Sequence, residues 1–327
     1  MEMIDMKEAI VILVNGEVLA GTKESTIQDQ KSSAALLAEG LLPIITSDLN
    51  VAVMHGNKPQ VGYVLFRSEL ANHVLHRIPL DVCGADTQGA TGYMLSQAIT
   101  NILRGDNNGR KVMPITTQTI IDSESEHFLE RNKQIGPWLD RERAEHRRQV
   151  YGWYIKEEPG YGYRRVVASP PPIEIVEIDG IKQLIQSGMI VIAAGGGGVP
   201  VMVDEKGLLV GVEAVVDTDR VACMLAHQIN AKILLMIVED DFQFVHAGIN
   251  INDYSSITGE ELGAKLTNTD IGSNIVIRKL KSAHEHIQHG GSQVIITTLK
   301  KLKQTLNKKS GLWIGEKNAV VDLTEMI

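Results

Sequence analysis

The sequence contains little cysteine, few aromatic residues and no long apolar run. Two cysteines in 327 residues cannot form a disulfide framework, so Cys83 and Cys223 are expected to be buried thiols in a reducing compartment. No apolar stretch approaches the roughly 20 residues that a membrane-spanning helix needs. Aromatic residues make up only 4% of the chain, whereas 30 residues are glycine. This composition suits an α/β protein with many strand-to-helix turns better than an all-β sandwich.

The sequence also lacks an excess of positive charge. Lysine and arginine number 32 against 40 acidic residues, which gives a formal charge of -8. This balance argues against a surface built to neutralise nucleic-acid phosphates. The segment Met1 to Glu8 shows no signal-peptide pattern. We therefore expect a cytoplasmic protein that binds neither nucleic acid nor membrane.

Strand and helix signals alternate along the chain. Continuous apolar, β-branched runs predict buried strands, the clearest at Ala9–Val14, Val51–Met54 and Ile233–Val238. An apolar stripe with helical spacing begins after Pro59 and continues to Leu75. Strands that alternate with helices predict a mainly parallel sheet covered on both faces. In such sheets, ligands bind beyond the carboxyl ends of the strands.

The stretch from about residue 116 to 163 breaks this alternation. It is rich in arginine and glutamate and lacks a long buried strand. We interpret it as an inserted subdomain or lid that projects from the main sheet.

Three strand exits carry glycine turns: Asn15-Gly16, His55-Gly56-Asn57 and Gly195 to Gly198. Backbone N–H groups at such turns favour anions, especially phosphates. The alternative is a flexible connection without a ligand. The glycine run is neither a Walker A loop nor a dinucleotide-binding fingerprint, because the residues those motifs require do not follow.

Seven segments, in this order along the chain, carry a family resemblance. They are His55-Gly56-Asn57-Lys58-Pro59-Gln60-Val61-Gly62, Pro79 to Ala85, Gly92-Tyr93-Met94-Leu95, Lys133-Gln134-Ile135-Gly136-Pro137, Tyr163 to Pro170, Ile190 to Pro200 and Gly211 to Asp217. Through them nearly the whole chain resembles the carbamate kinases of the amino-acid kinase superfamily.

The resemblance implies a three-layer α/β/α fold with a mainly parallel central sheet. It implies an N-terminal, carbamate-side lobe over residues 1–115, a protruding subdomain over 116–168 and a nucleotide-side lobe over 169–327. The implied reaction is reversible phosphoryl transfer between carbamoyl phosphate and ADP, with Mg2+ accompanying ATP or ADP, in a homodimer. Such transfer depends on alignment and on positive charge along the path of the phosphoryl group.

The resemblance also implies the residues of the site. The catalytic candidates are Lys133, Asp219, Lys58 and Arg278. The substrate-binding candidates are Asn15, Gly16, Gly56, Asn57 and Gln60. The nucleotide-binding candidates are Gly195, Gly196, Gly197, Gly198, Asp217, Asp241, Gly272 and Ser273. No residue is assigned to a metal site.

Lysines that the family uses are replaced at two positions. Thr218 stands where a lysine normally lies between two aspartates, here Asp217 and Asp219. Another family lysine follows a glycine-serine pair, and the aligned position falls near Ile277. Arg278 and Lys279 are its neighbours, and a one-residue shift could bring either into the site.

The loops around the ligands depart from the family pattern as well. Glu17 replaces an asparagine and places negative charge beside an expected anion site. Lys58 replaces a glycine and could supply part of the lost positive charge. The acidic run Glu239-Asp240-Asp241 replaces a threonine-aspartate pattern near the nucleotide.

Two hypotheses about activity follow. In the first, the protein is a phosphotransferase with rearranged charges, acting on carbamoyl phosphate or on another carbamate-like or carboxylate substrate. In the second, it is a catalytically impaired relative that binds a small anion or a partner protein. Removing one preorganised charge costs about 10²–10³ in rate, so two uncompensated losses would leave little turnover.

Other polar residues have simpler explanations. His284, His286 and His289 are expected to lie on a solvated helix surface, because no cysteine or carboxylate cluster completes a metal site. Asp219 is expected to open a helix, where N-capping would explain it as readily as catalysis.

Overall fold

The computed structural model describes residues 7–20, 26–241, 244–245, 247–267, 274–315 and 323–327. Within these residues the largest sheet has the strand order β13-β15-β14-β12-β1-β2-β9-β3, and its neighbouring strands run parallel except for the pair β14 and β15. Its strands are β1 Ala9–Val14, β2 Asn50–His55, β3 Val112–Pro114, β9 Ile190–Ile192, β12 Ile233–Val238, β13 Ser255–Ile257, β14 Gln293–Thr298 and β15 Leu312–Gly315. The predicted mainly parallel sheet is confirmed.

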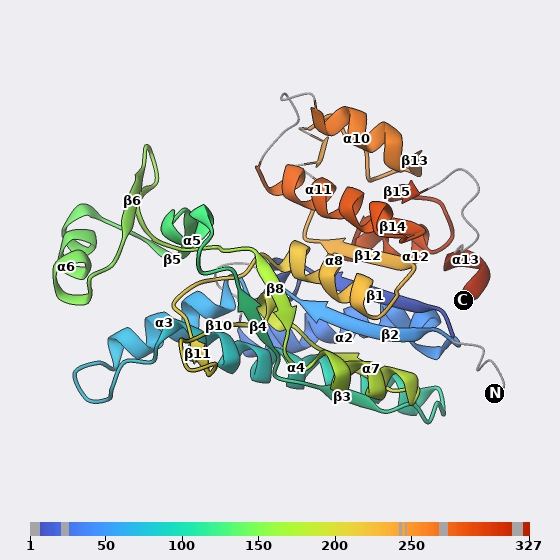
Figure 1. Cartoon of the computed structure of the whole chain (residues 1–327). Helices are drawn as coiled ribbons and strands as arrows, with labels where there is room; N and C mark the ends of the chain where they lie inside the picture. Colours follow the sequence, from blue (N-terminus) through green and yellow to red (C-terminus); the bar gives the residue numbers. More distant parts are fainter. Residues whose placement is uncertain (1–6, 21–25, 242–243, 246, 268–273, 316–322) are drawn as a thin grey trace.

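Helices cover both faces of this sheet and give three layers (Figure 1). Strand β1 is buried along its whole length, and its side chains alternate between two cores. Val11 and Leu13 pack with α7 Ile178–Gln186, α8 Thr218–Gln228, α10 Gly259–Thr267 and α11 Asn274–Gln288. Ile10 and Ile12 pack with α1 Gly16–Ala20, α2 Ile27–Thr46, α4 Leu80–Gly105, α12 Leu302–Thr305 and α13 Leu323–Met326. Burial on both faces is why the strand sequence is continuously apolar.

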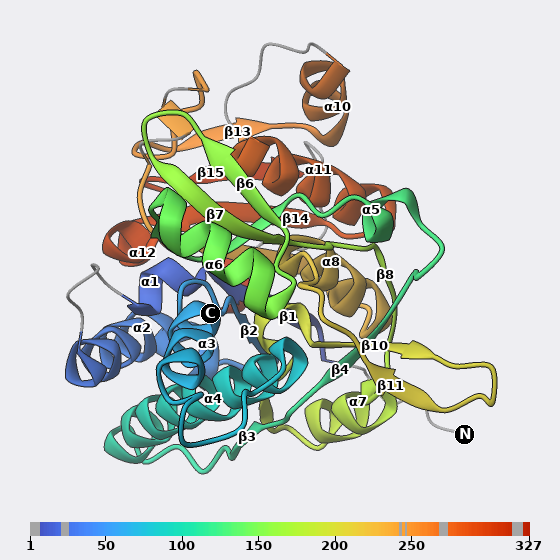
Figure 2. The ribbon, with the colours of Figure 1, turned by 90° about the vertical axis from the view of Figure 1, so that its left-hand side faces the viewer.

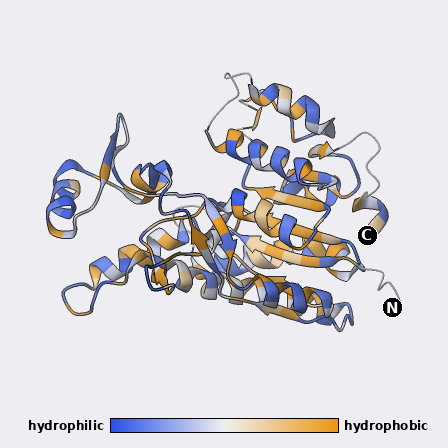
Figure 3. Ribbon diagram, in the orientation of Figure 1, coloured by the Kyte–Doolittle hydropathy of each residue, from blue (hydrophilic) through white to orange (hydrophobic). Residues whose placement is uncertain are grey.

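The described residues also form two smaller sheets. One has the order β11-β10-β4-β8, with β4 Gln118–Ile121, β8 Pro172–Ile175, β10 Val199–Val203 and β11 Leu209–Gly211. The other has the order β5-β7-β6, with β5 Lys133–Leu139, β6 Ile155–Glu158 and β7 Gly162–Val167. The second sheet and α6 Arg141–Tyr151 stand apart from the main sheet, with α5 Glu126–Leu129 nearby (Figures 1 and 2). The main-sheet strands are mostly hydrophobic, whereas α6 is mostly hydrophilic (Figure 3).

Several predicted boundaries differ from the structure. Helix α3 Gln60–Leu70 ends before the last residues of its predicted stripe, and Val74 and Leu75 are 74% and 62% exposed. The pair Asn15-Gly16 is not an isolated turn, because α1 begins at Gly16. The segment after β14 is a 3₁₀ turn, Leu299–Lys301, followed by α12. No helix among the described residues is long and apolar enough to span a bilayer.

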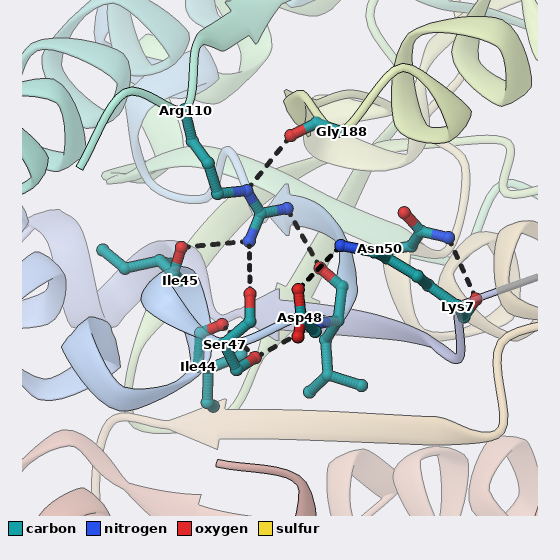
Figure 4. Close-up of polar contacts among 9 residues, drawn as sticks. Lys7, Ile44, Ile45, Ser47, Asp48, Asn50, Arg110 and Gly188 are labelled. Atoms are coloured by element: carbon teal, nitrogen blue, oxygen red, sulfur yellow. Dashed lines mark hydrogen bonds and ion pairs between the residues drawn. The ribbon is translucent and has the colours of Figure 1, made fainter.

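Arg110 joins three elements at the amino end of β2 (Figure 4). Its guanidinium donates hydrogen bonds to the carbonyl oxygens of Ile45 at 3.0 Å, Ser47 at 3.3 Å, Leu49 at 3.0 Å and Gly188 at 3.1 Å. These carbonyls belong to the end of α2, the start of β2 and the turn after α7. Carbonyls at a helix C-terminus lack partners within the helix, and a cation there is favourable. One side chain therefore fixes both helices to the edge of the sheet.

We expect Arg110→Ala to lower the free energy of unfolding by about 2–4 kcal/mol, because several carbonyls lose a charged donor together. Urea denaturation followed by circular dichroism measures this change. Arg104→Ala, at an exposed position of α4, is the matched control and should change the free energy by less than about 0.5 kcal/mol. Equal effects of the two substitutions would contradict the role of Arg110.

Candidate functional site

The carboxyl ends of three adjacent strands create the site. Strand β1 pairs in parallel with β2 and with β12, so Val14 lies opposite both His55 and Ile237. The loops that follow are tied together by their backbones. The Asn15 N–H donates to the Ile237 carbonyl at 2.9 Å, and the Gly56 N–H donates to the Val14 carbonyl at 2.8 Å. The predicted residues of the first two glycine turns therefore lie side by side.

Gly16 and Gly56 are required by close backbone packing. A Cβ on Gly16 would collide with the backbone of Lys58, and a Cβ on Gly56 would collide with the backbone of Gly16. Gln60 secures this junction, because its side-chain amide donates to the Gly16 carbonyl at 3.2 Å. Three of the predicted substrate-binding residues therefore meet at one rigid contact.

The run Gly195 to Gly198 forms a second tight junction. Three of its residues have positive φ, between 67° and 89°. Cβ atoms on the successive glycines would meet His55, Asn57, Val216 and Thr119. Close packing against protein neighbours therefore explains these glycines without a ligand. This explanation stands beside the interpretation of the run as an anion site. The run joins the β2 loop to the segment before α8.

Lys279 is the central cation of the site. Its Nζ lies 2.6 Å from Asp219 Oδ1 and 2.9 Å from the side-chain oxygen of Asn15. The Lys279 and Asp219 side chains are only 4% and 12% exposed. This contact joins the end of β1, the first turn of α8 and the first turns of α11.

Asp217 forms ion pairs with two further cations. Its Oδ2 lies 3.4 Å from Lys133 Nζ and 3.4 Å from Arg278 Nε. Burial by itself would raise the pKa of Asp217, but attraction from Lys133, Arg278 and Lys279 outweighs burial and lowers the pKa below its ordinary value. Asp217 is also the N-cap of α8, since its Oδ1 accepts the Asp219 N–H at 3.1 Å.

This geometry corrects one expectation. Asp219 is not the N-cap, and its carboxylate is occupied by Lys279 instead. Lys133 is the first residue of strand β5. A strand from the protruding sheet therefore brings Lys133 to the start of α8.

Lys58 and Glu17, the two departures in the ligand loops, face each other. Their charged atoms lie 4.0 Å apart, and both side chains are partly exposed. Burial lowers the pKa of Lys58 below its ordinary value, although Glu17 opposes this change. The positive charges of Arg164, Lys133 and Arg278 lower it further. Glu17 therefore offsets Lys58 at one edge of a cationic cluster.

Some predicted residues lie outside this cluster. Asp241 has Asn252 as its side-chain partner among the described residues. Burial raises the pKa of its neighbour Glu239, and the charges of Glu17 and Asp240 raise it further. Gly272 and Ser273 lie outside the residues that the structure describes. The structure therefore groups Asn15, Lys58, Lys133, Asp217, Asp219 and Arg278 and leaves Asp241 apart.

The family resemblance places a lysine near Ile277 and leaves Arg278 and Lys279 as its neighbours, and the structure shows Lys279 in contact with Asn15 and Asp219. The apolar face of α11 includes Val276, Leu280 and Ala283, all buried. Lys279 lies in this buried stripe by helical spacing, whereas Ile277 is only half-buried. A lysine within the apolar stripe of a helix was the sequence signal for a buried ion pair.

His286 is also placed differently from the expectation. Its side chain is buried against the Lys232 carbonyl, and burial lowers its pKa to about 4. The predicted solvated surface is therefore wrong for this histidine. No group of histidine, cysteine or carboxylate residues in the described ranges could hold a metal ion.

The chemistry available at this site is electrostatic. Burial raises the pKa of Cys83 to about 11 and that of Cys223 to about 12, so neither thiol is an activated nucleophile. Burial also lowers the pKa of His55 to about 4, which leaves its imidazole neutral near pH 7. What remains is a set of fixed cations held by aspartates. Such a set can orient an anion and stabilise charge that develops on it.

Comparisons with known proteins agree on one family. The sequence profile of the amino acid kinase family matches residues 8–298. A carbamate kinase of Pyrococcus horikoshii is 36% identical over 94% of this chain and 98% of its own length. A carbamate kinase-like protein of Escherichia coli is 34% identical, over 94% and 99%. The solved structure of a Giardia lamblia carbamate kinase bound to AMP-PNP superposes with a TM-score of 0.83 at 29% identity, over 94% of this chain and 98% of that one.

The buried contact between Lys279 and Asp219 should be energetically coupled. We expect Lys279→Met to lower the free energy of unfolding by about 3–5 kcal/mol, because Asp219 is left buried without a cation. The double variant Lys279→Met/Asp219→Asn should lose clearly less than the sum of the two single variants. Urea denaturation of the four proteins measures the coupling, and strictly additive losses would show that the contact contributes nothing.

Proposed function

The chain belongs to the amino acid kinase family and, within it, to the carbamate kinase family of phosphotransferases, and we propose that it transfers a phosphoryl group between carbamoyl phosphate and ADP. A terminal oxygen of the ADP β-phosphate attacks the phosphorus atom of carbamoyl phosphate. The bond between that phosphorus and the carbamate oxygen breaks, so ATP forms and carbamate leaves. The reverse direction makes carbamoyl phosphate from ATP and carbamate.

One observation carries this proposal: the cations at the carboxyl ends of β1 and β12 come from separate elements and converge. Lys279 and Arg278 come from α11, Lys133 from β5 and Lys58 from the loop after β2. Phosphoryl transfer needs little covalent help from protein, and it is accelerated mainly by alignment and by positive charge around the transferring group. A preorganised cluster of this kind meets that requirement.

The cluster also bears on the family lysines that the sequence replaces. Lys279 supports activity, because it brings a cation to Asp219 although Ile277 occupies the aligned position. Arg278 reaches Asp217, next to the Thr218 replacement. The negative charge of Glu17 is partly balanced by Lys58. These contacts support the active phosphotransferase over the impaired relative.

We assign the two substrates to the two lobes as the family resemblance implies. We assign the carbamate side to residues 1–115, with Asn15, Gly56 and Asn57 near the acceptor, and the nucleotide side to residues 169–327. Mg2+ enters with ADP or ATP as part of the substrate, where phosphate oxygens and water supply most of its ligands. Residues 116–168 bring Lys133 across to the nucleotide side.

We further propose a cytoplasmic homodimer. The second copy would bind at edge strand β3 and at helix α4, which packs against it. Tyr93 on α4 is 52% exposed, and Met113 on β3 is 39% exposed. Large apolar side chains beside a sheet edge favour pairing with another chain. The two buried thiols fit a reducing compartment.

Formation of ATP from carbamoyl phosphate and MgADP tests the activity. Arg278→Met should lower kcat by about 10²–10³, because one charge beside the transferring phosphoryl group is lost. Its side chain is 44% exposed, so the fold should survive. Lys265→Met, at an exposed position of α10, is the matched control and should keep full activity. No ATP formation by the unmodified protein at substrate-level concentration would reject the proposal.

Lys58 and Glu17 should behave as a compensating pair. Lys58→Gly alone should lower kcat/KM by about tenfold, because Glu17 then repels the anionic substrate without an opposing charge. Lys58→Gly/Glu17→Asn restores the family residues at both positions and should recover most of the loss. Steady-state kinetics with varied carbamoyl phosphate measure both effects. A double variant no better than Lys58→Gly would refute compensation.

A further inference from the structure

A groove runs between helices α8 and α11. It lies on the same side of the main sheet as the phosphotransfer cluster, which consists of Lys58, Lys133, Arg278 and Lys279 with their acidic partners. The groove has a volume of about 440 Å3, and Pro171 and Pro172 are among its lining residues. The N-cap Asp217 and the α8 residues Arg220 and His227 share one face of the helix. A volume of this size is typical of pockets that hold small organic ligands.

The charged groups along the groove are mostly cationic. Arg220 and Lys281 are exposed and have no ion pair or side-chain hydrogen bond within the described ranges. At one end, Arg278 and Asp217 neutralise each other at 3.4 Å. Glu285 is the remaining carboxylate of the lining. Among the described residues, the groove is therefore lined by two cations and one carboxylate that have no ion pair.

The far end of the groove adds hydrogen-bond donors. The rings of His227 on α8 and His289, which directly follows α11, lie with their centroids 5.2 Å apart. Between the two ends, Cys223 and Met224 give the wall an apolar stretch. A ligand that combines a short hydrocarbon or ester framework with more than one acidic group would satisfy both kinds of surface. Arginine suits such groups, because its planar fork binds carboxylate and phosphate in a bidentate manner.

We propose that this groove is a second binding site, for a small multivalent anion, held by Arg220 and Lys281. The ligand is a polycarboxylate or a phosphate compound, which share this chemistry. Arg278 lines both the groove and the phosphotransfer cluster, so the two sites are neighbours. The proposal does not depend on turnover, since binding can be measured in a protein that transfers no phosphate.

Isothermal titration calorimetry of the full chain with citrate, and separately with inorganic pyrophosphate, tests the site and distinguishes the two ligand classes. Acetate serves as the monovalent comparison and should bind more weakly. We expect Arg220→Glu/Lys281→Glu to weaken the tighter of the two multivalent ligands by at least about tenfold. Lys265→Glu/Arg104→Glu makes the same change in net charge at exposed positions of α10 and α4 and should leave binding unchanged.

Three results would overturn the proposal. The first is undetectable binding of both probes to the unmodified protein at about millimolar concentration. The second is an equal loss in the two double variants, which would indicate a general effect of net charge. The third is binding that survives Arg220→Glu/Lys281→Glu and disappears in Lys58→Ala, which would place the anion in the phosphotransfer cluster. Circular dichroism confirms that each variant is folded.

Discussion

The buried contact of Lys279 with Asp219 and Asn15 is the interaction on which the site depends. It joins the end of β1 to the starts of α8 and α11, and those helices cover the same face of the main sheet. A buried cation is stable only when its partners are close and well oriented. The sheet provides that orientation, because parallel strands place their carboxyl ends at one edge. The fold therefore fixes a positive charge where an anion would bind.

The remaining charges are arranged around this contact as a balanced set. Asp217 holds Lys133 and Arg278 and caps α8, and Glu17 faces Lys58. The acids lower the cost of bringing several cations together, and the cations Lys133 and Arg278 lower the pKa of Asp217. At Thr218, where the family resemblance implies a lysine, residues of other elements therefore still supply positive charge, since Lys133 and Arg278 both reach Asp217.

The sequence was enough to predict the framework and to name several residues that the structure brings together. Apolar runs such as Ala9–Val14 located the central strands, because burial on both faces demands continuous hydrophobicity. The contact between Glu17 and Lys58 was not foreseeable, because it depends on the parallel register of β1 and β2. The resemblance left both Arg278 and Lys279 open beside the position near Ile277, although the place of Lys279 in the apolar stripe of α11 marked it as buried. Contacts between distant segments require the fold, whereas helical phase can be read directly.

We propose that Lys279, Arg278 and Lys133 together surround the phosphoryl group that moves. An electron-density map of crystals soaked with MgADP and carbamoyl phosphate would show where the phosphates bind. We expect phosphate oxygens within hydrogen-bonding distance of all three side chains, with the carbamoyl group toward Lys58. Phosphates bound away from Lys279, or ligands on only one side of the cluster, would contradict it.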